Sequence, residues 1–308
     1  MSKKQHEHKA INRLIQVSVP TNIFFNIILL IFALACIIPF IIVLIISFTD
    51  ENSIAQFGYQ LIPDKFSVES YLFLWNERST IFNSLGVSLF VTVIGTALGV
   101  LLTSMLGYVL SRRQYKFRKF FVWMVFIPMI FNGGMVASYA INIQMLHFKN
   151  GLHALILPLL VSSFNVIIAR TFFQQTIPDA IIESAKIDGA SELRIFRTII
   201  LPVSTPVLAT LGLFLAFGYW NDWYLSMLYI TNQSKYSLQY LLQQIVANIE
   251  FIAKTPGIGV NMQEYLSKMP REGVRMAIAV IIVLPIAIVY PFFQKYFISG
   301  LTIGAVKG

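Results

Sequence analysis

The stretch that decides the fold is residues 14–49, LIQVSVPTNIFFNIILLIFALACIIPFIIVLIISFT, in which 36 consecutive residues carry no charge. About 20 apolar residues in a helix span the hydrocarbon core of a bilayer. A cleavable signal sequence has an apolar region of only about 7–15 residues, followed by a small-residue cleavage site. Residues 14–49 fit neither feature, so we expect a retained membrane-spanning helix here.

The composition indicates that lipid surrounds most of the chain. Of its 308 residues, 56% are hydrophobic and 12% are charged, whereas soluble domains contain about 25% charged residues. The net charge of +9 does not indicate a nucleic-acid partner, because the basic residues form short clusters between apolar runs instead of one face. The single cysteine, Cys36, lies within an apolar run, and the four histidines lack the spacing of metal ligands. We therefore expect no metal and no cofactor in this chain.

Apolar stretches of spanning length recur along the sequence, which predicts an all-α membrane protein with six transmembrane helices. The predicted spans are residues 23–48, 81–110, 120–146, 152–169, 199–220 and 276–297. We find no repeat and no linker, and we expect one membrane domain over residues 23–299. Gly95 and Gly99 in the second span form a G-x-x-x-G pair, which predicts close packing of this helix inside a bundle.

Charge between the spans predicts the orientation, because short cytoplasmic loops are rich in Lys and Arg. Residues 112–119 hold five basic residues and no acid, whereas residues 50–78 hold five acids and two basic residues. The first segment should therefore face the cytoplasm and the second the outside. Six spans then make residues 1–22 and 300–308 cytoplasmic tails, and residues 222–275 a long extracytoplasmic segment.

A polar segment, residues 171–198, separates the fourth and fifth predicted spans. Thr176 is expected to cap a short helix that has Asp179 in its first turn. Gly189 is expected to end that helix in a left-handed conformation, and Ser191 to cap a second short helix. Such an amphipathic hairpin could lie in the membrane interface. Its acids and bases are in near balance, which favours insertion into a groove of a partner protein.

The hairpin also carries a spaced motif. Glu183-Ser184-Ala185 is followed after three residues by Gly189, after nine more by Ile199, and then by Leu201-Pro202. This pattern resembles the signature of the permeases of ABC importers, with Ser184 in place of the usual alanine. In that family the signature forms the coupling helix, which docks into a cleft of the ATP-binding subunit. The resemblance thus implies a coupling role for Glu183, Ser184, Ala185, Asp188, Gly189, Leu201 and Pro202.

The similarity extends to residues 131–135, 165–173, 187–191, 220–223 and 303–308, and there it looks most like the carbohydrate-importer branch. Within that branch it is most similar to permeases for oligosaccharides and polysaccharides, related to the second permease of the maltose transporter. The resemblance implies the transmembrane domain of a type I ABC importer in a bacterial cytoplasmic membrane. It also implies a second homologous permease, two ATP-binding subunits that hold ATP and Mg, and an extracytoplasmic sugar-binding protein. Residues 232–271 and the N-terminal tail lie outside the similarity.

Two groups of residues are candidates for the substrate path. Trp220, Asn221, Asp222 and Trp223 stand at the outer end of the fifth span, where rings can stack on sugars and polar tips can bind hydroxyls. For Trp220 and Trp223 taken individually, an aromatic belt at the lipid interface is the alternative, and the sequence slightly favours it. The second group is Asn132, Gly133 and Gly134, which interrupt the third span, with Tyr139 as a weaker candidate. Helix packing or a simple bend is the alternative for this second group.

Other function classes fit the sequence less well. The chain lacks the G-x-x-x-x-G-K-[ST] loop that cradles nucleotide phosphates, so ATP must be hydrolysed by another chain. A secondary transporter would need ionisable residues within its spans, and a membrane enzyme would need a nucleophile with a base or a metal cluster. The predicted spans offer almost none of these groups. An amino-acid or metal importer of the same superfamily stays open, as does the identity of the sugar.

Overall fold

The computed structural model describes residues 19–254 and 270–305. The described chain consists of helices and loops, with one isolated antiparallel bridge between Thr49 and Phe66. Two compact units divide it: Met1–Leu74 with Ser267–Val280, and Trp75–Leu266 with Ile281–Gly308. Most of the predicted N-terminal tail, part of the predicted C-terminal tail and residues 255–269 of the long segment lie outside the described residues.

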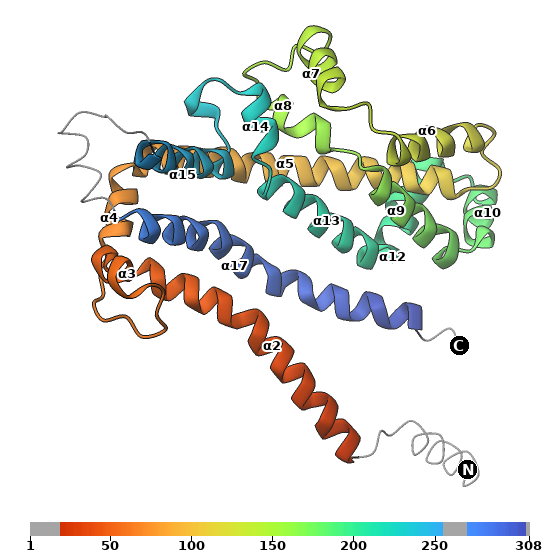
Figure 1. The fold of residues 1–308 in the computed structure, drawn as a ribbon. Helices are drawn as coiled ribbons and strands as arrows, with labels where there is room; N and C mark the ends of the chain where they lie inside the picture. Colours follow the sequence, from red (N-terminus) through yellow and green to blue (C-terminus); the bar gives the residue numbers. More distant parts are fainter. Residues whose placement is uncertain (1–18, 255–269, 306–308) are drawn as a thin grey trace. The chain divides into compact units, whose positions relative to one another are not determined.

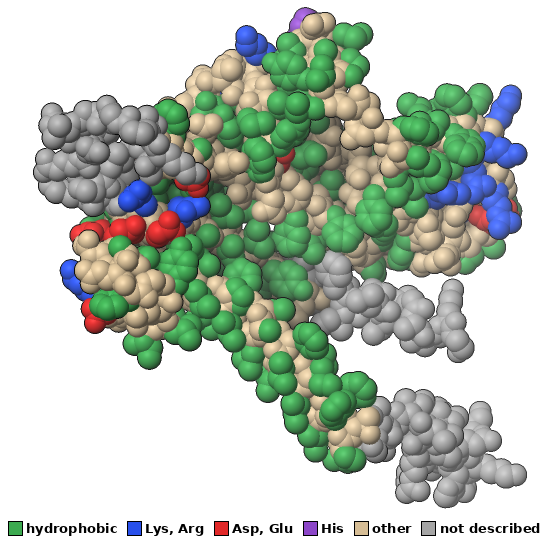
Figure 2. Space-filling view, viewed as in Figure 1, with side chains coloured by type: hydrophobic (Ala, Val, Ile, Leu, Met, Phe, Trp, Pro, Cys, Tyr) green, Lys and Arg blue, Asp and Glu red, His purple; other side chains and the backbone are tan. Residues whose placement is uncertain are grey.

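Three single helices of the described chain are long and apolar enough to cross a membrane: α2 (Val19–Ser47), α5 (Arg78–Ser111) and the first part of α17 (Arg271–Ala305). Side chains of α2 such as Phe24, Phe32 and Phe40 are all about 60% exposed, and hydrophobic side chains cover this helix in Figure 2. An apolar helix surface of this kind is stable only against lipid or another apolar chain. The first and last predicted spans and the second are therefore present as helices.

Two further spans are bent pairs of helices. α8 (His153–Ile156) and the short 3₁₀ turn Leu157–Leu159 meet α9 (Ser163–Thr176) at 48°. The second pair, Glu192–Val203 with α13 (Thr205–Trp220), is bent by 84°. Counting each pair as one span raises the number of possible spans from three to five.

The predicted third span, residues 120–146, is not one helix. It is divided into α6 (Arg118–Ile130) and α7 (Met135–Gln144), each shorter than the roughly 20 residues that a spanning helix needs. Gly134 has φ 83°, a conformation that is accessible mainly to glycine, and its N–H donates to Asn132 Oδ1 at 2.9 Å. This local turn ends the helix, and the total of six spans stays a prediction.

In the first unit, α2 is followed by α3 (Glu51–Phe57) and α4 (Glu69–Asn76). Asp50 caps α3 by accepting from Ser53 N at 3.3 Å. The Glu51 carboxylate accepts from the backbone N–H groups of Glu272 and Gly273, in the first turn of α17, at 3.1 and 3.2 Å. A carboxylate at this position is stabilised by the unpaired donors and the dipole of the helix N-terminus.

The second unit is built around α5, which packs along α9 and α13 (Figure 1). The prediction of close packing through small residues is confirmed. A Cβ added at Gly95 would overlap the ring of Tyr219 in α13, and one added at Gly107 would lie 2.5 Å from Ala169 Cβ in α9. The helix axes can approach this closely only because these α5 residues have no side chain.

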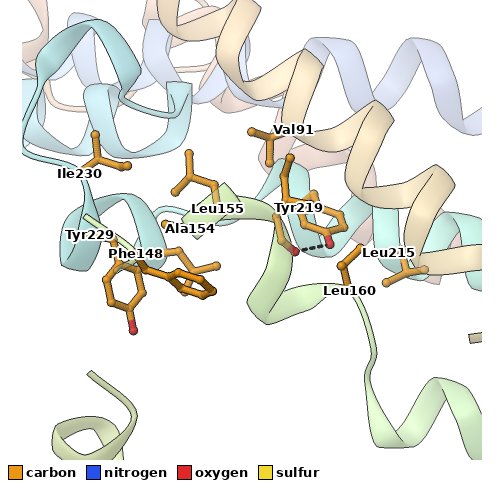
Figure 3. Close-up of a cluster of buried hydrophobic side chains, with 11 residues drawn as sticks. Val91, Phe148, Ala154, Leu155, Leu160, Leu215, Tyr219, Tyr229 and Ile230 are labelled. Atoms are coloured by element: carbon orange, nitrogen blue, oxygen red, sulfur yellow. Dashed lines mark hydrogen bonds between the residues drawn. The ribbon is translucent and has the colours of Figure 1, made fainter. Parts of the chain in front are cut away.

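A buried hydrophobic cluster joins α8 and α14 (Tyr224–Tyr229) to the α5–α13 pair (Figure 3). At its centre the Tyr219 hydroxyl donates to the Ile156 carbonyl at 2.7 Å. Nearby, α15 (Leu238–Lys254) lies along α5, and its first residue, Leu238, donates its N–H to Ser88 Oγ at 2.8 Å. Part of the predicted long segment 222–275 is thus folded onto the bundle.

Candidate coupling hairpin and translocation-path residues

The hairpin consists of α10 (Asp179–Ile187) and α11 (Glu192–Ile195). Gly189 has φ 78°, as predicted, and Ser191 Oγ accepts from Arg194 N at 3.4 Å, which confirms the predicted cap. The predicted cap at Thr176 is wrong. Residue 176 is the last residue of α9, and Pro178 occupies the position before α10 without a side-chain cap. The preceding helix continues through Thr176 because its apolar face packs against α5.

Hydrophobic contacts hold the inner face of the hairpin against the bundle. Ile182 of α10 is 5% exposed and belongs to a buried cluster with side chains of α5, α9 and α11. The other buried members of this cluster are Tyr108, Ala169, Phe173, Ile177, Ile195, Phe196, Ile200, Val207 and Leu211. Burial of a side chain of this size contributes about 1.5–3 kcal/mol. The hairpin is therefore part of the folded core of the second unit.

The outer face of the hairpin combines apolar and acidic side chains. Ile187 is 87% exposed and Leu193 59% exposed, and Glu183 and Asp188 are exposed beside them. Ser184 is also exposed, and its hydroxyl donates to the Ile181 carbonyl at 3.0 Å. This internal bond satisfies the hydroxyl, so the serine fits a face that otherwise offers apolar and acidic contacts.

Ion pairs and hydrogen bonds fix the hairpin laterally. Lys186 Nζ lies 2.6 Å from Glu192 Oε1, which joins α10 to α11. Gln114 donates from Nε2 to Glu183 Oε1 at 3.3 Å, and Arg112 Nη1 lies 2.9 Å from Asp179 Oδ1. Figure 2 shows Lys and Arg side chains gathered at the end of this unit that carries α6 and α10. The hairpin and the basic segment 112–119 thus occupy the same end of the unit.

An irregular connection joins the hairpin to α13. Residues Phe196–Ile200 form a π-helical turn, which Leu201 and Pro202 follow in the short helix α12 (Leu201–Val203). Ser204 ends α12, and its hydroxyl donates to the Ile200 carbonyl at 2.6 Å. Pro202 and Pro206 have no N–H to donate to the helix ladder. The 84° bend therefore has a local cause in the sequence.

The tryptophans near the end of α13 differ in their surroundings. Trp220 is 5% exposed, and its indole N–H donates to the Ile282 carbonyl of α17 at 3.2 Å. Trp223 is 38% exposed, and Asn221 is exposed while its amide donates to Phe217 O at 3.0 Å. In this structure Trp220 packs between helices, whereas Trp223 and Asn221 are accessible to a ligand.

Asp222, between these residues, is half-buried. Burial raises the pKa of its carboxyl to about 6, and backbone N–H groups of Leu225 and Tyr224 oppose the rise. The bond from Leu225 N is 3.3 Å long. Asp222 thus caps the start of α14 and titrates closer to neutrality than an exposed aspartate.

The second group of candidates for the substrate path includes Asn132, Gly133 and Tyr139, and residues near it are also held in place. Asn132 and Gly133 are exposed. The Tyr139 ring is stacked on that of Tyr229, with centroids 5.8 Å apart. Tyr229 in turn accepts at its hydroxyl from Asn142 Nδ2 at 2.9 Å.

Sequence reasoning missed two residues whose contacts fix the structure around the candidate groups. Asn150, with φ 55°, accepts at Oδ1 from the backbone N–H groups of Thr231 and Asn232 at 2.7 and 3.0 Å. The Asn-Gly dipeptide at 150–151 is a turn signal that could have drawn attention to it. The second is Arg112, which the sequence shows only as one of five basic residues. The described residues contain no cluster of three or more potential metal ligands.

Comparison with known proteins gives one consistent result. Residues 99–303 match the family model described as "Binding-protein-dependent transport system inner membrane component". The chain is 40% identical over 286 residues to a polygalacturonan/rhamnogalacturonan transport system permease protein of Bacillus subtilis, covering 91% of this chain and 96% of that protein. It is 40% identical over 272 residues to Protein LplC of the same organism, covering 88% and 90%.

Among solved structures, the chain resembles a bacterial ABC transporter involved in the import of the acidic polysaccharide alginate. The TM-score is 0.77 at 26% sequence identity, and the match covers 92% of this chain and 99% of the other. The folds therefore agree over nearly the full length of both chains.

Proposed function

Because this chain belongs to the family of inner membrane components of binding-protein-dependent transport systems, we propose that it imports oligosaccharides or polysaccharide fragments by ATP-driven alternating access. It is a permease subunit of an ABC importer, and permease subunits are not themselves enzymes. Its partners would be a second homologous permease, two ATP-binding subunits and an extracytoplasmic sugar-binding protein. The relatives named for polygalacturonan, rhamnogalacturonan and alginate support a polysaccharide-derived cargo.

The hairpin α10–α11 carries this proposal. Its inner face is anchored by Ile182 in the buried cluster, while Ile187, Leu193 and Glu183 remain exposed on its outer face. An exposed apolar surface flanked by acids suits a cleft with basic residues at its rim. The hairpin would dock into the ATP-binding subunit, with Glu183 paired to a basic residue there. Exposed Gly189 would permit close approach, whereas Ala185 is half-buried and packs against the buried cluster on the inner face.

The proposed transport mechanism follows from the way the hairpin is anchored to the helix bundle. Closure of the ATP-binding subunits would pull the hairpin as a rigid lever, because its inner face is continuous with the core that contains α5, α9 and α13. The bundle would then change from inward-facing to outward-facing and accept sugar from the loaded binding protein. ATP hydrolysis would then return the bundle to the inward-facing state. We propose that both termini are cytoplasmic, and that Asn132, Gly133, Tyr139, Asn221 and Trp223 contribute to the path, with Trp220 supporting it by packing.

Reconstitution of this chain with the products of neighbouring genes tests the proposal. In lipid vesicles, a loaded binding protein should stimulate ATP hydrolysis and drive uptake from a panel of neutral and acidic oligosaccharides. Glu183→Arg should abolish stimulated uptake and reduce co-purification of the ATP-binding subunit. The same charge reversal at exposed Glu77, at the opposite end of α5, is the matched control for co-purification. Normal uptake by Glu183→Arg would refute the coupling role, and uptake driven by an ion gradient alone would refute the importer assignment.

A further inference from the structure

Arg112 occupies an unusual position at the junction of three helices. It directly follows α5, and its side chain is only 14% exposed. Its Nη1 pairs with Asp179 Oδ1 of α10 at 2.9 Å, and its Nη2 donates to the Phe173 carbonyl in the last turn of α9 at 3.2 Å. Nε donates to Ser111 Oγ at 2.9 Å. The guanidinium also lies over the Tyr108 ring, 5.3 Å from its centroid.

The charges of this junction agree with the helix dipoles. Arg112 lies at the C-terminal ends of α5 and α9, where a cation is favourable, and Asp179 lies in the first turn of α10, where an anion is favourable. Arginine suits this position because its planar fork offers several donors in fixed directions. A lysine could keep one of these contacts but not all of them.

Other polar groups nearby do not form the same link. Arg118 and Arg170 both donate from Nε to the Leu110 carbonyl, at 3.0 and 3.3 Å. These bonds tie the end of α5 to α6 and α9 but do not reach the hairpin. Between the hairpin and the region 108–114, the described polar contacts are Arg112–Asp179 at 2.9 Å, Gln114–Glu183 at 3.3 Å and Tyr108–Glu192 at 3.4 Å. Of these three contacts, Arg112–Asp179 is the shortest, and it is the one that forms an ion pair.

We propose that Arg112 and Asp179 are positioning residues that transmit displacement of the hairpin to α5, and thereby set how many sugar molecules are imported per ATP hydrolysed. This inference rests on the coupling function proposed above. Apolar contacts such as those of Ile182 anchor the hairpin to the core but are non-directional. A charge-assisted bond to a guanidinium held on three sides adds a contact of fixed direction between the hairpin and the end of α5. Because α5 is one continuous helix that packs against both α9 and α13, a displacement of its C-terminal end would also move these contacts.

The reconstituted complex provides the test, with the ratio of sugar imported to ATP hydrolysed as the readout. Asp179→Asn keeps the size of the side chain and removes its charge, and Arg112→Lys keeps the charge and loses the fork. Each should lower the ratio roughly three- to tenfold, within the range of coupling between contacting residues. Asp179→Glu should retain most of it. Arg113→Gln is the matched control, because Arg113 is exposed and adjacent, and its ratio should equal that of the wild type.

The outcomes separate this inference from the proposed function. If Glu183→Arg abolishes uptake while Asp179→Asn and Arg112→Lys keep the wild-type ratio, the junction has no coupling role and the inference is wrong. If Glu183→Arg also transports normally, the coupling function itself fails. Gel filtration of each complex checks assembly. Both junction variants could also lose assembled complex and sugar uptake in the same proportion, while the sugar imported per ATP hydrolysed stays unchanged. In that case the Arg112–Asp179 pair only stabilises the structure, and the inference is wrong.

Discussion

Substitution of Gly95 by alanine tests the packing at the centre of the bundle. A Cβ at this position would lie 2.6 and 2.7 Å from Cε2 and Cε1 of Tyr219, and closer still to Cζ, whereas carbon atoms in favourable contact are about 3.5–4.0 Å apart. The ring must therefore move by about 1 Å. Tyr219 is 3% exposed, and its hydroxyl is bonded to the Ile156 carbonyl at 2.7 Å (Figure 3), so this movement would stretch or break that bond.

The magnitude follows from three contributions. Overpacking of a core costs about 1–3 kcal/mol, and loss of a buried hydrogen bond costs about 1–2 kcal/mol. Alanine recovers about 0.5–1 kcal/mol over glycine in a helix interior. We expect Gly95→Ala to lower the free energy of unfolding by about 1–4 kcal/mol.

Denaturant-induced unfolding of the purified chain in detergent measures this change. Gly86→Ala in the same helix is the matched control, since a Cβ there meets nothing within 4 Å, and it should leave stability unchanged or raise it slightly. Adding Tyr219→Leu to Gly95→Ala should cost less than the sum of the two single changes. Equal stability of Gly95→Ala and Gly86→Ala would refute the packing argument.

Two further predictions concern the loops after α7 and α13. Because the pKa of Asp222 is about 6 in the folded chain and about 3.9 when unfolded, the native state binds more protons between these values, and stability should fall as pH rises from about 4 to 6. Asp222→Asn keeps a capping side chain but cannot titrate, so it should make the free energy of unfolding less dependent on pH between about 4 and 6. Denaturant unfolding across this pH range measures the slope, and a slope equal to that of the wild type would contradict the prediction. Asn150→Ala should destabilise the loop held at Thr231 by about 1–3 kcal/mol, seen as faster amide exchange there, whereas the exposed neighbour Lys149→Ala should not.

Features that depend on neighbouring residues could be predicted from the sequence, whereas features that depend on contacts between distant segments could not. The apolar runs predict α2, α5 and α17, because helix formation in lipid depends on local composition. The turn at Gly189 and the cap at Ser191 follow from single residues and their neighbours. Thr176 failed as a cap because the packing of α9 against α5 extends that helix, and packing overrides a local capping preference.

Side-chain roles that depend on tertiary contacts could not be read from the sequence. The burial of Trp220 depends on α17, which contains its hydrogen-bond acceptor Ile282, 62 residues further along the chain. In the basic segment, Arg112 and Arg113 are equivalent by composition, yet Arg112 alone of these two turns toward Asp179. The sequence predicted a hairpin with exposed acids, and the structure adds the contacts that connect it to α5.

The π-helical turn at Phe196–Ile200 gives this connection one place where its length can change in evolution. A π turn holds one more residue than an α turn, so deleting one residue there would restore a regular ladder and leave the segments on either side facing roughly as before. A one-residue deletion in the regular helix beside the turn would instead rotate the hairpin by about 100° relative to α13, and Ile182 would leave its buried cluster. We therefore expect length changes between Gly189 and Pro202 to be tolerated at Phe196–Ile200 before any other place in the connection.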